Sequence, residues 1–366
     1  MKYNWQLADW GNFSYSTDGM EDILYEFAEN VGHIKGLLKA MPDDVQEEAL
    51  IETLISEAIK TSEIENEYLS RKDVISSIRH NLGLYKPKKE IRDDRAKGIG
   101  KLMIEVRQSY YESLTAQTLK DWHQYLFLNQ SHIKVGEWRT HKTPMQVVSG
   151  RLDKPTIHFE APPSSAVPHE IQKFIKWFSD TQAKHSIKDA AIRSAISHIY
   201  FESIHPFEDG NGRIGRAISD KALSQSLGFP LLLSLSTTIE KNKKAYYSAL
   251  ENGQKSNEIT PWILYFLNLI VDAQKDVEFL IDFTLKKTEF FDEYVQKLNQ
   301  RQLKSINRMF QEGPNGFQGG MTTKKHIAIT KTSKATATRD LKTLQEIGAF
   351  RVEGSGRNTR YYLNMD

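Results

Sequence analysis

The 366-residue sequence contains no cysteine. This absence excludes disulfide bonds, thiol catalysis and cysteine-bound zinc, and it is typical of a cytosolic protein. The sequence also lacks an excess of either charge, because 49 lysines and arginines face 47 aspartates and glutamates, for a formal net charge of +2. The chain as a whole therefore offers no polycation to nucleic acid or to a membrane, and any such binding must come from a local patch.

Long hydrophobic runs are missing as well. The first residues lack the apolar segment of a signal peptide. The longest apolar run, which begins at Trp262, is too short to span a membrane and is typical of a buried helix. We therefore expect a cytoplasmic protein that does not bind a membrane. The length of 366 residues is sufficient for two or three domains.

One segment, HPFEDGNGRIGR at 205–216, carries far more chemical functionality than a connecting loop requires. It combines one imidazole, two carboxylates, a Gly-Asn-Gly turn and two guanidinium groups, and residues with helical periodicity follow it. A glycine-rich turn that leads into a helix directs unpaired N–H groups and the positive end of the helix dipole at an anion. The pattern therefore predicts an active site that binds phosphate.

The side chains of this segment have separate chemical uses. Arg213 and Arg216 are three residues apart on the first helical turn, and each could hold phosphate oxygens through two hydrogen bonds. Asp209 stands where a Mg²⁺ ion that bridges those phosphates would need a carboxylate. His205 is the group that can act as a neutral base near physiological pH. We expect Phe207 to anchor the loop through hydrophobic contacts.

The segment resembles the Fic motif, H-x-F-x-[DE]-G-N-G-R-x-x-R, and every specified position matches. The resemblance implies a protein adenylyltransferase, in which a Ser, Thr or Tyr hydroxyl of a target protein attacks the α-phosphorus of ATP. His205 would take the proton of that hydroxyl, and Asp209 would hold Mg²⁺ on the α- and β-phosphates. Charge developing at phosphorus would be stabilised by Gly210, Asn211 and Gly212, and the β- and γ-phosphates would be oriented by Arg213 and Arg216.

A second short pattern, TSEIEN at 61–66, ends a predicted helix. Taken alone it is an acidic helix end with solvated carboxylates. Beside a Fic motif it is similar to the inhibitory signature of that family, [S/T]-x-x-x-E-[G/N], with Thr61, Glu65 and Asn66 at the specified places. The resemblance implies that Glu65 pairs with Arg216 and denies the γ-phosphate its partner, since carboxylates and phosphates compete for the same guanidinium group.

Two further segments gain a meaning from the resemblance. Residues 135–163 are rich in Thr, Val and aromatic side chains with Gly150 as a candidate turn, which predicts a β-hairpin. The resemblance implies that this hairpin, at about 145–160, is a flap that binds a target protein by strand addition.

A helix with Tyr246 and Tyr247 resembles the wall of the nucleotide pocket, and one of these rings could stack on adenine, although aromatic residues of helices often belong to the core.

The C-terminal region changes in character from Arg301 onward. Its periodicity predicts three helices and then two strands around a Gly-Ser-Gly-Arg tip, similar to a winged helix-turn-helix with residues 333–347 as the recognition helix. Residues 321–366 carry nine lysines and arginines against four aspartates and glutamates, which suits the phosphate backbone of duplex DNA. A dimerisation or interaction module that never touches DNA is the alternative.

These patterns together predict a mainly α protein with a Fic-type helical bundle, a small β-hairpin flap and a C-terminal winged helix-turn-helix. We expect an N-terminal helical region over 1–100, a catalytic core over 101–290, a winged-helix domain over 291–366, and a homodimer.

The expected function is ATP-dependent protein adenylylation repressed by Glu65. The alternative is a nucleotide-sensing, DNA-binding transcriptional regulator, against which His205 argues, because a sensor needs a phosphate grip but no base. Transfer of another nucleotide, removal of AMP and the target protein stay open.

Overall fold

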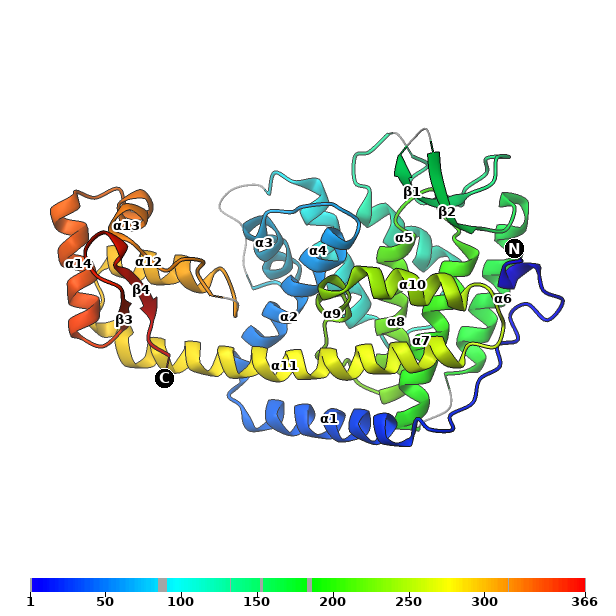
Figure 1. Ribbon diagram of the computed structural model, residues 1–366, viewed down its shortest axis with the longest axis horizontal. Coiled ribbons are helices and arrows are strands. Elements are labelled where there is room, and N and C mark those ends of the chain that lie inside the picture. The colour runs from blue at the N-terminus through cyan, green and yellow to red at the C-terminus, as the bar shows by residue number, and fades with distance from the viewer. Residues whose placement is uncertain are drawn as a thin grey trace. The chain divides into compact units, whose positions relative to one another are not determined.

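The computed structural model describes residues 2–84, 91–131, 133–151, 154–182, 186–314 and 316–365. Helices dominate it, and two small antiparallel sheets of two strands each complete the described secondary structure (Figure 1). The chain divides into a large unit, residues 1–40 and 53–277, and a small unit, residues 41–52 and 278–366. The mainly α fold with a β-hairpin is as predicted from the sequence, while the three-way domain division stays a prediction.

The N-terminal part of the chain forms five helices after a short 3-10 helix. They are η1 (Asn4–Gln6), α1 (Glu21–Ala40), α2 (Asp43–Ile64), α3 (Arg71–Asn81), α4 (Asp94–Gln108) and α5 (Ala116–Leu126). Thr115 precedes a stretch with helical spacing, which predicts an N-cap, and its hydroxyl caps α5 by accepting from the N–H of Thr118. The basic, proline-containing sequence of 85–98 predicts a solvated linker or loop. That prediction is wrong at its end, because Asp93 caps α4 and starts that helix earlier; residues 85–90 lie outside the described chain.

The predicted flap is a hairpin of β1 (Gln146–Arg151) and β2 (Lys154–Glu160) with an irregularity in register between Val147 and Val148. Gly150 was expected to form its turn but lies within β1, opposite Pro155. The two residues that connect the strands, 152 and 153, are outside the described chain. The hairpin places Val148 and Ile157 as a cross-strand pair, and both side chains are exposed.

The rest of the large unit consists of helices packed around α7. They are η2 (Ser164–Ala166), α6 (Val167–Asp180), α7 (Ile187–Ile204), α8 (Asn211–Leu227), α9 (Leu235–Lys241), α10 (Lys243–Gly253) and the first half of α11 (Thr260–Tyr294). The sequence before His205 is apolar around most of a helix, which predicts a central core helix, and every residue of α7 from Ala190 to Ile204 is buried. The sequence GFPLLLSLSTTIE at 228–240 predicts an extended linker. That prediction is wrong in part, because the Ser234 hydroxyl caps the short helix α9 by accepting from the N–H of Thr237.

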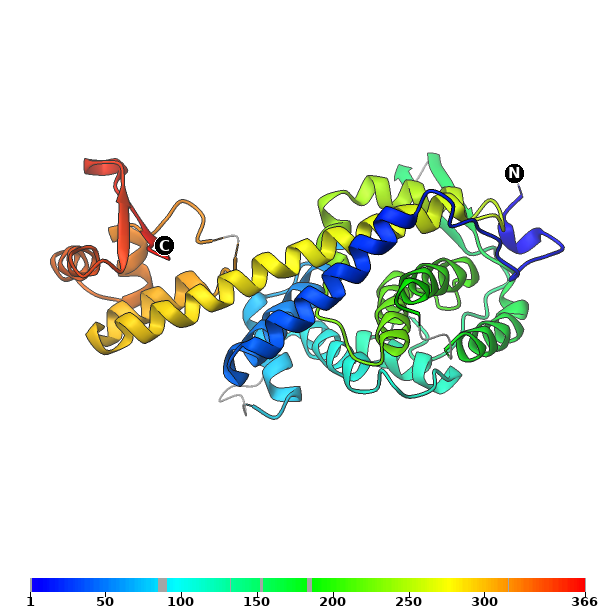
Figure 2. The ribbon, with the colours of Figure 1, turned by 90° about the horizontal axis from the view of Figure 1, so that it is seen from below.

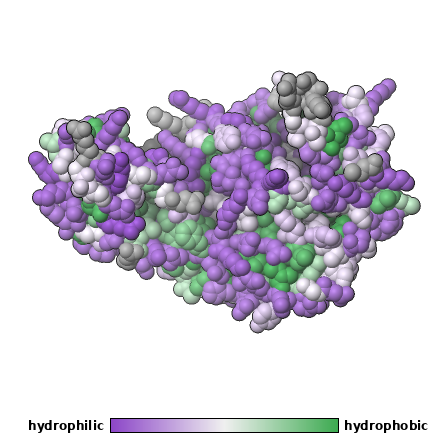
Figure 3. All heavy atoms as spheres, viewed as in Figure 1, coloured by the Kyte–Doolittle hydropathy of each residue, from purple (hydrophilic) through white to green (hydrophobic). Residues whose placement is uncertain are grey.

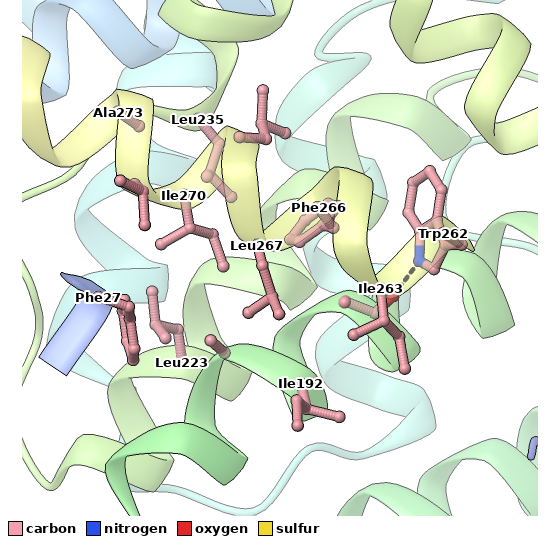
Figure 4. Packing of buried hydrophobic residues seen from close by; sticks show 14 of the residues in the cluster. Phe27, Ile192, Leu223, Leu235, Trp262, Ile263, Phe266, Leu267, Ile270 and Ala273 are labelled. Atoms are coloured by element: carbon pink, nitrogen blue, oxygen red, sulfur yellow. Dashed lines mark hydrogen bonds between the residues drawn. The ribbon is translucent and has the colours of Figure 1, made fainter. Parts of the chain in front are cut away.

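The hydrophobic core of the large unit joins α1, α7, α8 and α11 (Figure 4). The indole N–H of Trp262 donates to the carbonyl of Ala195 at 2.8 Å and so fixes α11 against α7. Helix α1 runs beside the first half of α11 in both ribbon views (Figures 1 and 2), and Gln274 donates to the carbonyl of Phe27 between them. Burial of these apolar residues gives α7 a rigid setting, and the active-site loop follows directly from its C-terminus.

The small unit contains the second half of α11 and a compact arrangement of three helices and a hairpin. These elements are η3 (Val295–Lys297), α12 (Gln300–Phe310), α13 (Thr323–Thr330), α14 (Lys334–Glu346), β3 (Phe350–Glu353), η4 (Gly356–Asn358) and β4 (Arg360–Leu363). Phe290, Ile306, Leu341 and Phe350 belong to its core. The order of three helices and two strands is the predicted one, and its identity as a winged helix stays a prediction.

Hydrophilic residues cover most of the face drawn in Figure 3, and apolar residues gather there in smaller patches. Within the described residues, no helix combines the length and the apolar character needed to cross a membrane.

Candidate active site

His205 follows the last residue of α7 and has a left-handed backbone, with φ 50° and ψ 61°. Such a conformation is uncommon for a residue other than glycine, and it persists only where surrounding contacts hold it. Here the N–H of His205 donates to the carbonyl of Phe201 at 3.0 Å. The carbonyls of His205 and Pro206 accept from Nε and from the backbone N–H of Arg139, respectively. The chain therefore leaves α7 in a sharp turn that is fixed on both sides.

Arg139 is a buried clamp on this turn. Its guanidinium donates to the carbonyls of His205 at 2.8 Å, Pro162 at 2.6 Å and Ile204 at 3.3 Å. The last carbonyls of a helix have no intrahelical partner, and Arg139 satisfies two of them at the end of α7. Burial lowers the pKa of Arg139 to about 10, so it stays charged at neutral pH. Sequence reasoning missed this role, because nothing local signals contacts with carbonyls some 65 residues away.

The His205 ring is suited to accept a proton. Burial, and then the positive charge of Arg139, lower the pKa of His205 to about 4, so the imidazole is neutral at neutral pH. Its Nδ1 lies 3.7 Å from Oε2 of Glu202, and it has no hydrogen-bond partner in the described part of the chain. Burial raises the pKa of Glu202 to about 8, against the opposing charge of Arg216, so Glu202 is protonated at neutral pH. The sequence reasoning also missed Glu202.

The loop between His205 and α8 is closed by its own side chains. Asn211 accepts from the N–H of Phe207 and donates to the carbonyl of the same residue, both at 2.9 Å. Phe207 is buried as predicted, and its ring stacks on His123 with centroids 4.2 Å apart. Gly210 has φ 79°, and a Cβ there would lie 2.7 Å from the ring of Phe127. The Asn211 side chain is thus occupied within the loop, which leaves its backbone N–H for a ligand.

The N-terminus of α8 faces Glu65. Helix α8 begins at Asn211, and the first N–H groups of a helix have no intrahelical partner. A Cβ on Gly212 would collide with Oε1 of Glu65, so the carboxylate lies directly against this turn. A carboxylate at a helix N-terminus is favourable for the same reason as a phosphate. The Glu65 carboxylate therefore lies at the helix N-terminus where the sequence predicts an anion site.

Arg216 is buried and receives three contacts from the end of α2. Its Nη2 donates to Oε1 of Glu65 at 2.8 Å and to the carbonyl of Thr61 at 3.0 Å, and its Nε donates to the Thr61 hydroxyl at 2.8 Å. Burial opposes the charge of Arg216, but the Glu65 carboxylate outweighs it and raises the pKa. The structure thus brings together Thr61, Glu65 and Arg216, which the sequence had paired.

Arg213 pairs with a residue that the sequence analysis did not select. Its Nη1 donates to Oε2 of Glu67 at 2.8 Å, and its Nη2 lies 3.9 Å from Oδ1 of Asp209. The alternation of glutamates at 63, 65 and 67 is the one sequence signal that could have drawn attention to Glu67. Each motif arginine is therefore held by its own carboxylate from the segment that follows α2.

Asp209 is the residue of the turn that the sequence assigns to a metal ion. Its carboxylate is more than half exposed and accepts from the N–H of Gly210 at 2.5 Å. The described residues contain no group of three or more acidic or histidine side chains that could hold a metal by themselves. Mg²⁺ commonly binds through one or two carboxylates together with phosphates and water, and a single exposed carboxylate beside a phosphate site fits that pattern.

The two tyrosines predicted beside the nucleotide occupy different environments. Tyr246 is 1% exposed, and its hydroxyl lies 2.7 Å from Nε2 of His198, which is itself buried. Tyr247 is 41% exposed, and its ring centroid lies 5.1 Å from that of Tyr246. Tyr247 is therefore the ring available to a ligand, while Tyr246 packs within the core.

Comparison with known proteins agrees with this geometry. Residues 113–223 match the Fic/DOC family, and residues 3–84 match a domain of unknown function, DUF4172. A probable protein adenylyltransferase of Aquifex aeolicus is 32% identical over 97 residues, which cover 26% of this chain and 27% of that protein. The protein adenylyltransferase fic-1 of Caenorhabditis elegans is 23% identical over 155 residues, 42% of this chain and 27% of that protein. The match thus spans about a quarter of each of these relatives.

Solved structures of similar fold include a Fic family protein from Desulfovibrio desulfuricans. It has a TM-score of 0.53 and 18% identity, with 93% of this chain and 96% of that chain covered. The Fic-1 structure from Caenorhabditis elegans has a TM-score of 0.52 and 19% identity, with 72% of this chain and 74% of that chain covered. Similarity at these identities establishes the fold.

Proposed function

The chain carries a domain of the Fic/DOC family at residues 113–223, and from this premise we propose that it is a protein adenylyltransferase that transfers AMP from ATP to a hydroxyl side chain of a target protein. The observation that carries the proposal is a neutral imidazole, His205, on the loop that leads into a helix N-terminus with two buried arginines. The names of the two relatives described above support it.

The residues suit an in-line transfer. His205 accepts the proton of a target Ser, Thr or Tyr hydroxyl while the hydroxyl oxygen forms a bond to the α-phosphorus of ATP. The bond from that phosphorus to the bridging oxygen breaks, and pyrophosphate leaves. The N–H groups of Asn211, Gly212 and Arg213 at the start of α8 stabilise charge that develops on the phosphoryl oxygens. No covalent intermediate on the protein is required.

The two arginines hold the rest of the triphosphate. We assign the β-phosphate to Arg213 and the γ-phosphate to Arg216, since buried guanidinium groups at fixed positions orient a leaving group with little loss of entropy. Mg²⁺ would neutralise negative charge on the phosphates, with Asp209 as its carboxylate. Tyr247 is the better placed of the two tyrosines to stack on adenine, because Tyr246 is buried and bonded to His198.

Glu65 represses the enzyme in this proposal. Its carboxylate lies at the α8 N-terminus and on Arg216, which are the two groups that we assign to the triphosphate. A carboxylate and a phosphate cannot occupy one place, so ATP binds productively only after Glu65 has moved.

The target protein docks along the flap in this proposal. The cross-strand pair of Val148 and Ile157 exposes two branched apolar side chains on one face of the hairpin. An added strand would cover them and pair with the free backbone groups of the hairpin edge. A cytoplasmic location and a homodimer stay predictions of the sequence.

Labelled nucleotides test the transfer directly. Incubation of a Glu65→Gly variant with a cell lysate and α-phosphate-labelled ATP should label one or more proteins beyond those labelled in the lysate alone, whereas γ-labelled ATP should give no label beyond that of the lysate alone. His205→Ala on the same background is the matched control, because it removes the base and leaves the phosphate contacts. Equal labelling with and without His205 would contradict the proposal.

A second activity, DNA binding by the small unit, is favoured by one observation. Helix α14 exposes Lys334, Arg339 and Lys342, while Asp340 on the same helix is buried and bonded to Arg301 at 2.8 Å. Because Asp340 is buried, the solvent-exposed face of this predicted recognition helix has a larger excess of positive charge than the helix sequence as a whole. We propose that the surface over 321–366 binds duplex DNA.

Gel-shift titration of the full chain at two salt concentrations tests this second proposal. Affinity should fall steeply as salt rises, because binding releases counterions from DNA phosphates. Replacement of the three exposed basic residues by Gln should remove the shift, whereas Lys176→Gln, at an exposed lysine of α6, should not. No shift at low salt would contradict DNA binding and would favour the alternative, in which the small unit is a dimerisation or interaction module.

A further inference from the structure

The contact between Glu67 and Arg213 has no place in the inhibition described so far, which acts through Glu65 and Arg216 alone. We propose that Glu67 is a second inhibitory carboxylate, which competes with the β-phosphate for Arg213 as Glu65 competes with the γ-phosphate for Arg216. This inference rests on the proposed function only in its assignment of phosphates. The contact itself is a short ion pair between a buried guanidinium and a partly exposed carboxylate.

The charged side chain of Arg213 is buried, and some of its hydrogen-bond donors are unsatisfied. Its side chain is 2% exposed, and two of its nitrogens, Nε and Nη2, are buried without a hydrogen-bond partner among the residues that the structure describes. A buried guanidinium with unmet donors is costly, and an anion with several oxygens would satisfy more of them than one carboxylate oxygen does. A phosphate group of a nucleotide is such an anion, so displacement of Glu67 by ligand is chemically favourable.

Arg213 has a support that does not depend on Glu67. Its guanidinium lies 5.0 Å from the centroid of the Phe127 ring, and that ring belongs to the buried core. A cation stacked on an aromatic face keeps its orientation when one hydrogen-bond partner leaves. Removal of the Glu67 carboxylate should therefore free Arg213 for a ligand and leave it in position.

The turn after α2 explains how two glutamates reach two arginines. Asn66 has φ 61°, and the N–H groups of Glu65 and Glu67 both donate to the carbonyl of Ser62, at 3.0 and 2.9 Å. Asparagine tolerates this left-handed conformation better than most residues, so the turn is stable where it ends the helix. It carries one carboxylate to each of the two arginines, Arg213 and Arg216, in the first two turns of α8. The protein thus presents two anionic groups where the ligand would present two phosphates.

A released Glu67 also has a cation nearby. Arg95, which pairs with Asp93 at 2.8 Å, is close enough that the negative charge of Glu67 contributes to raising the Arg95 pKa. Glu67 is 23% exposed, so it can move toward water or toward Arg95 without unpacking the core. The second contact can therefore open by a side-chain movement alone.

Nucleotide affinity distinguishes the two carboxylates. In the Glu65→Gly background, Glu67→Gln should strengthen binding of ADP and of ATP by about tenfold, the factor expected for one charge-assisted hydrogen bond. AMP, which lacks a β-phosphate, should bind equally to both variants. Isothermal titration calorimetry with the three nucleotides measures this, and a thermal melt of each variant verifies that it is folded.

Matched variants exclude a general effect of charge. Glu63 is a nearby carboxylate that pairs with Lys60 at 2.6 Å. Glu63→Gln should leave the affinities for AMP, ADP and ATP unchanged. In an Arg213→Ala background, Glu67→Gln should have no effect, because the arginine that it masks is gone. An unchanged ADP affinity for Glu67→Gln, or an equal gain for AMP, would overturn the proposal.

The outcome can be separated from that of the proposed function, because binding is measured without transfer. If Glu65→Gly transfers AMP but Glu67→Gln leaves ADP affinity unchanged, this inference fails and the adenylyltransferase proposal stands. If Glu67→Gln tightens ADP and ATP but no variant transfers AMP, the second carboxylate stands and the transfer proposal fails.

Discussion

The loop that carries His205 and the turn that carries Glu65 meet at the N-terminus of α8, but they are held in different ways. The loop is fixed from inside the protein by Arg139, by the Asn211 side chain and by the buried ring of Phe207. The turn is fixed to the active site chiefly through the very arginines that a ligand would use, and Glu65 is 28% exposed. One region is built to keep its geometry, and the other is built to be displaced.

Under the proposed function, this difference would let one protein hold a complete catalytic site and still repress it. Contacts of the loop are made with backbone carbonyls and core rings, so a nucleotide does not compete for them. Contacts of the turn are ion pairs, and each has a phosphate as its natural replacement. Substitutions in the loop should therefore destroy activity or stability, whereas substitutions in the turn should release activity.

Replacement of the base should have the largest effect. His205→Ala, made in the Glu65→Gly background, should reduce AMP transfer by about 10² to 10⁴, the usual contribution of a positioned general base. ATP affinity should change little, because His205 makes no phosphate contact in the proposed mechanism. Initial rates with α-labelled ATP and calorimetry with ATP measure the two quantities. Retention of more than about a tenth of the rate would refute the assignment.

Removal of the clamp should come next. Arg139→Met leaves the carbonyls of His205, Ile204 and Pro162 without their donor in a buried place. Buried carbonyls that lose a partner cost about 1 to 3 kcal/mol each, so the free energy of unfolding should fall by roughly 3 kcal/mol or more. Urea denaturation measures it.

A control for the clamp is Arg308→Met, which removes an exposed arginine that pairs with Glu312 and lies over the Phe317 ring at the surface of the small unit. This control should change stability by less than about 1 kcal/mol. A similar loss for both variants would mean that Arg139 is no more than an ordinary arginine, and the contrast between loop and turn would lose its basis.

Release of the turn should have a smaller effect with the opposite sign. Glu65→Gly should raise AMP transfer by roughly 10- to 100-fold, since one charge-assisted pair no longer competes with the triphosphate. Arg216→Ala combined with Glu65→Gly should not regain this activity, because the freed arginine is the reason for the gain. If the double variant is as active as the single one, Glu65 acts by some route other than Arg216.

The sequence predicted the parts of this site that lie close together in the chain. The motif from His205 to Arg216 and the signature from Thr61 to Asn66 are local patterns. The pairing of Glu65 with Arg216, 151 residues apart, was instead implied by the family resemblance, and the structure contains it. The β-hairpin and the Thr115 cap follow equally from local composition. Local patterns are sufficient where one short segment carries all the chemistry.

The sequence did not predict the residues whose role depends on tertiary contacts. Arg139 and Glu202 are ordinary charged residues in their own segments, and they act only because folding brings them beside His205. Glu67 was passed over because its carboxylate, like others in that segment, looks like a solvated charge until Arg213 is placed beside it. Periodicity also failed for α9, where a capping hydroxyl starts a helix within an apolar stretch.

The smallest predicted effect concerns the pH dependence of the base. His205 stays neutral above its pKa of about 4, and Glu202 stays neutral below its pKa of about 8, so neither group titrates between these values. The rate of transfer should therefore not change through titration of either group from about pH 5 to 7. Above pH 8, Glu202 loses its proton and places a negative charge 3.7 Å from Nδ1 of His205.

That charge favours the protonated imidazole, so it raises the pKa of His205 toward its ordinary value and makes the ring a stronger base. Transfer by the Glu65→Gly variant should consequently rise severalfold as the pH passes through 8. A target hydroxyl also becomes more reactive in alkali, and the matched variant Glu65→Gly/Glu202→Gln isolates the contribution of the carboxyl, since glutamine cannot ionise. The ratio of the two rates should be constant below pH 7 and increase above 8. A constant ratio over the whole range would show that Glu202 does not influence the base, and that the fixed loop holds His205 through its backbone contacts alone.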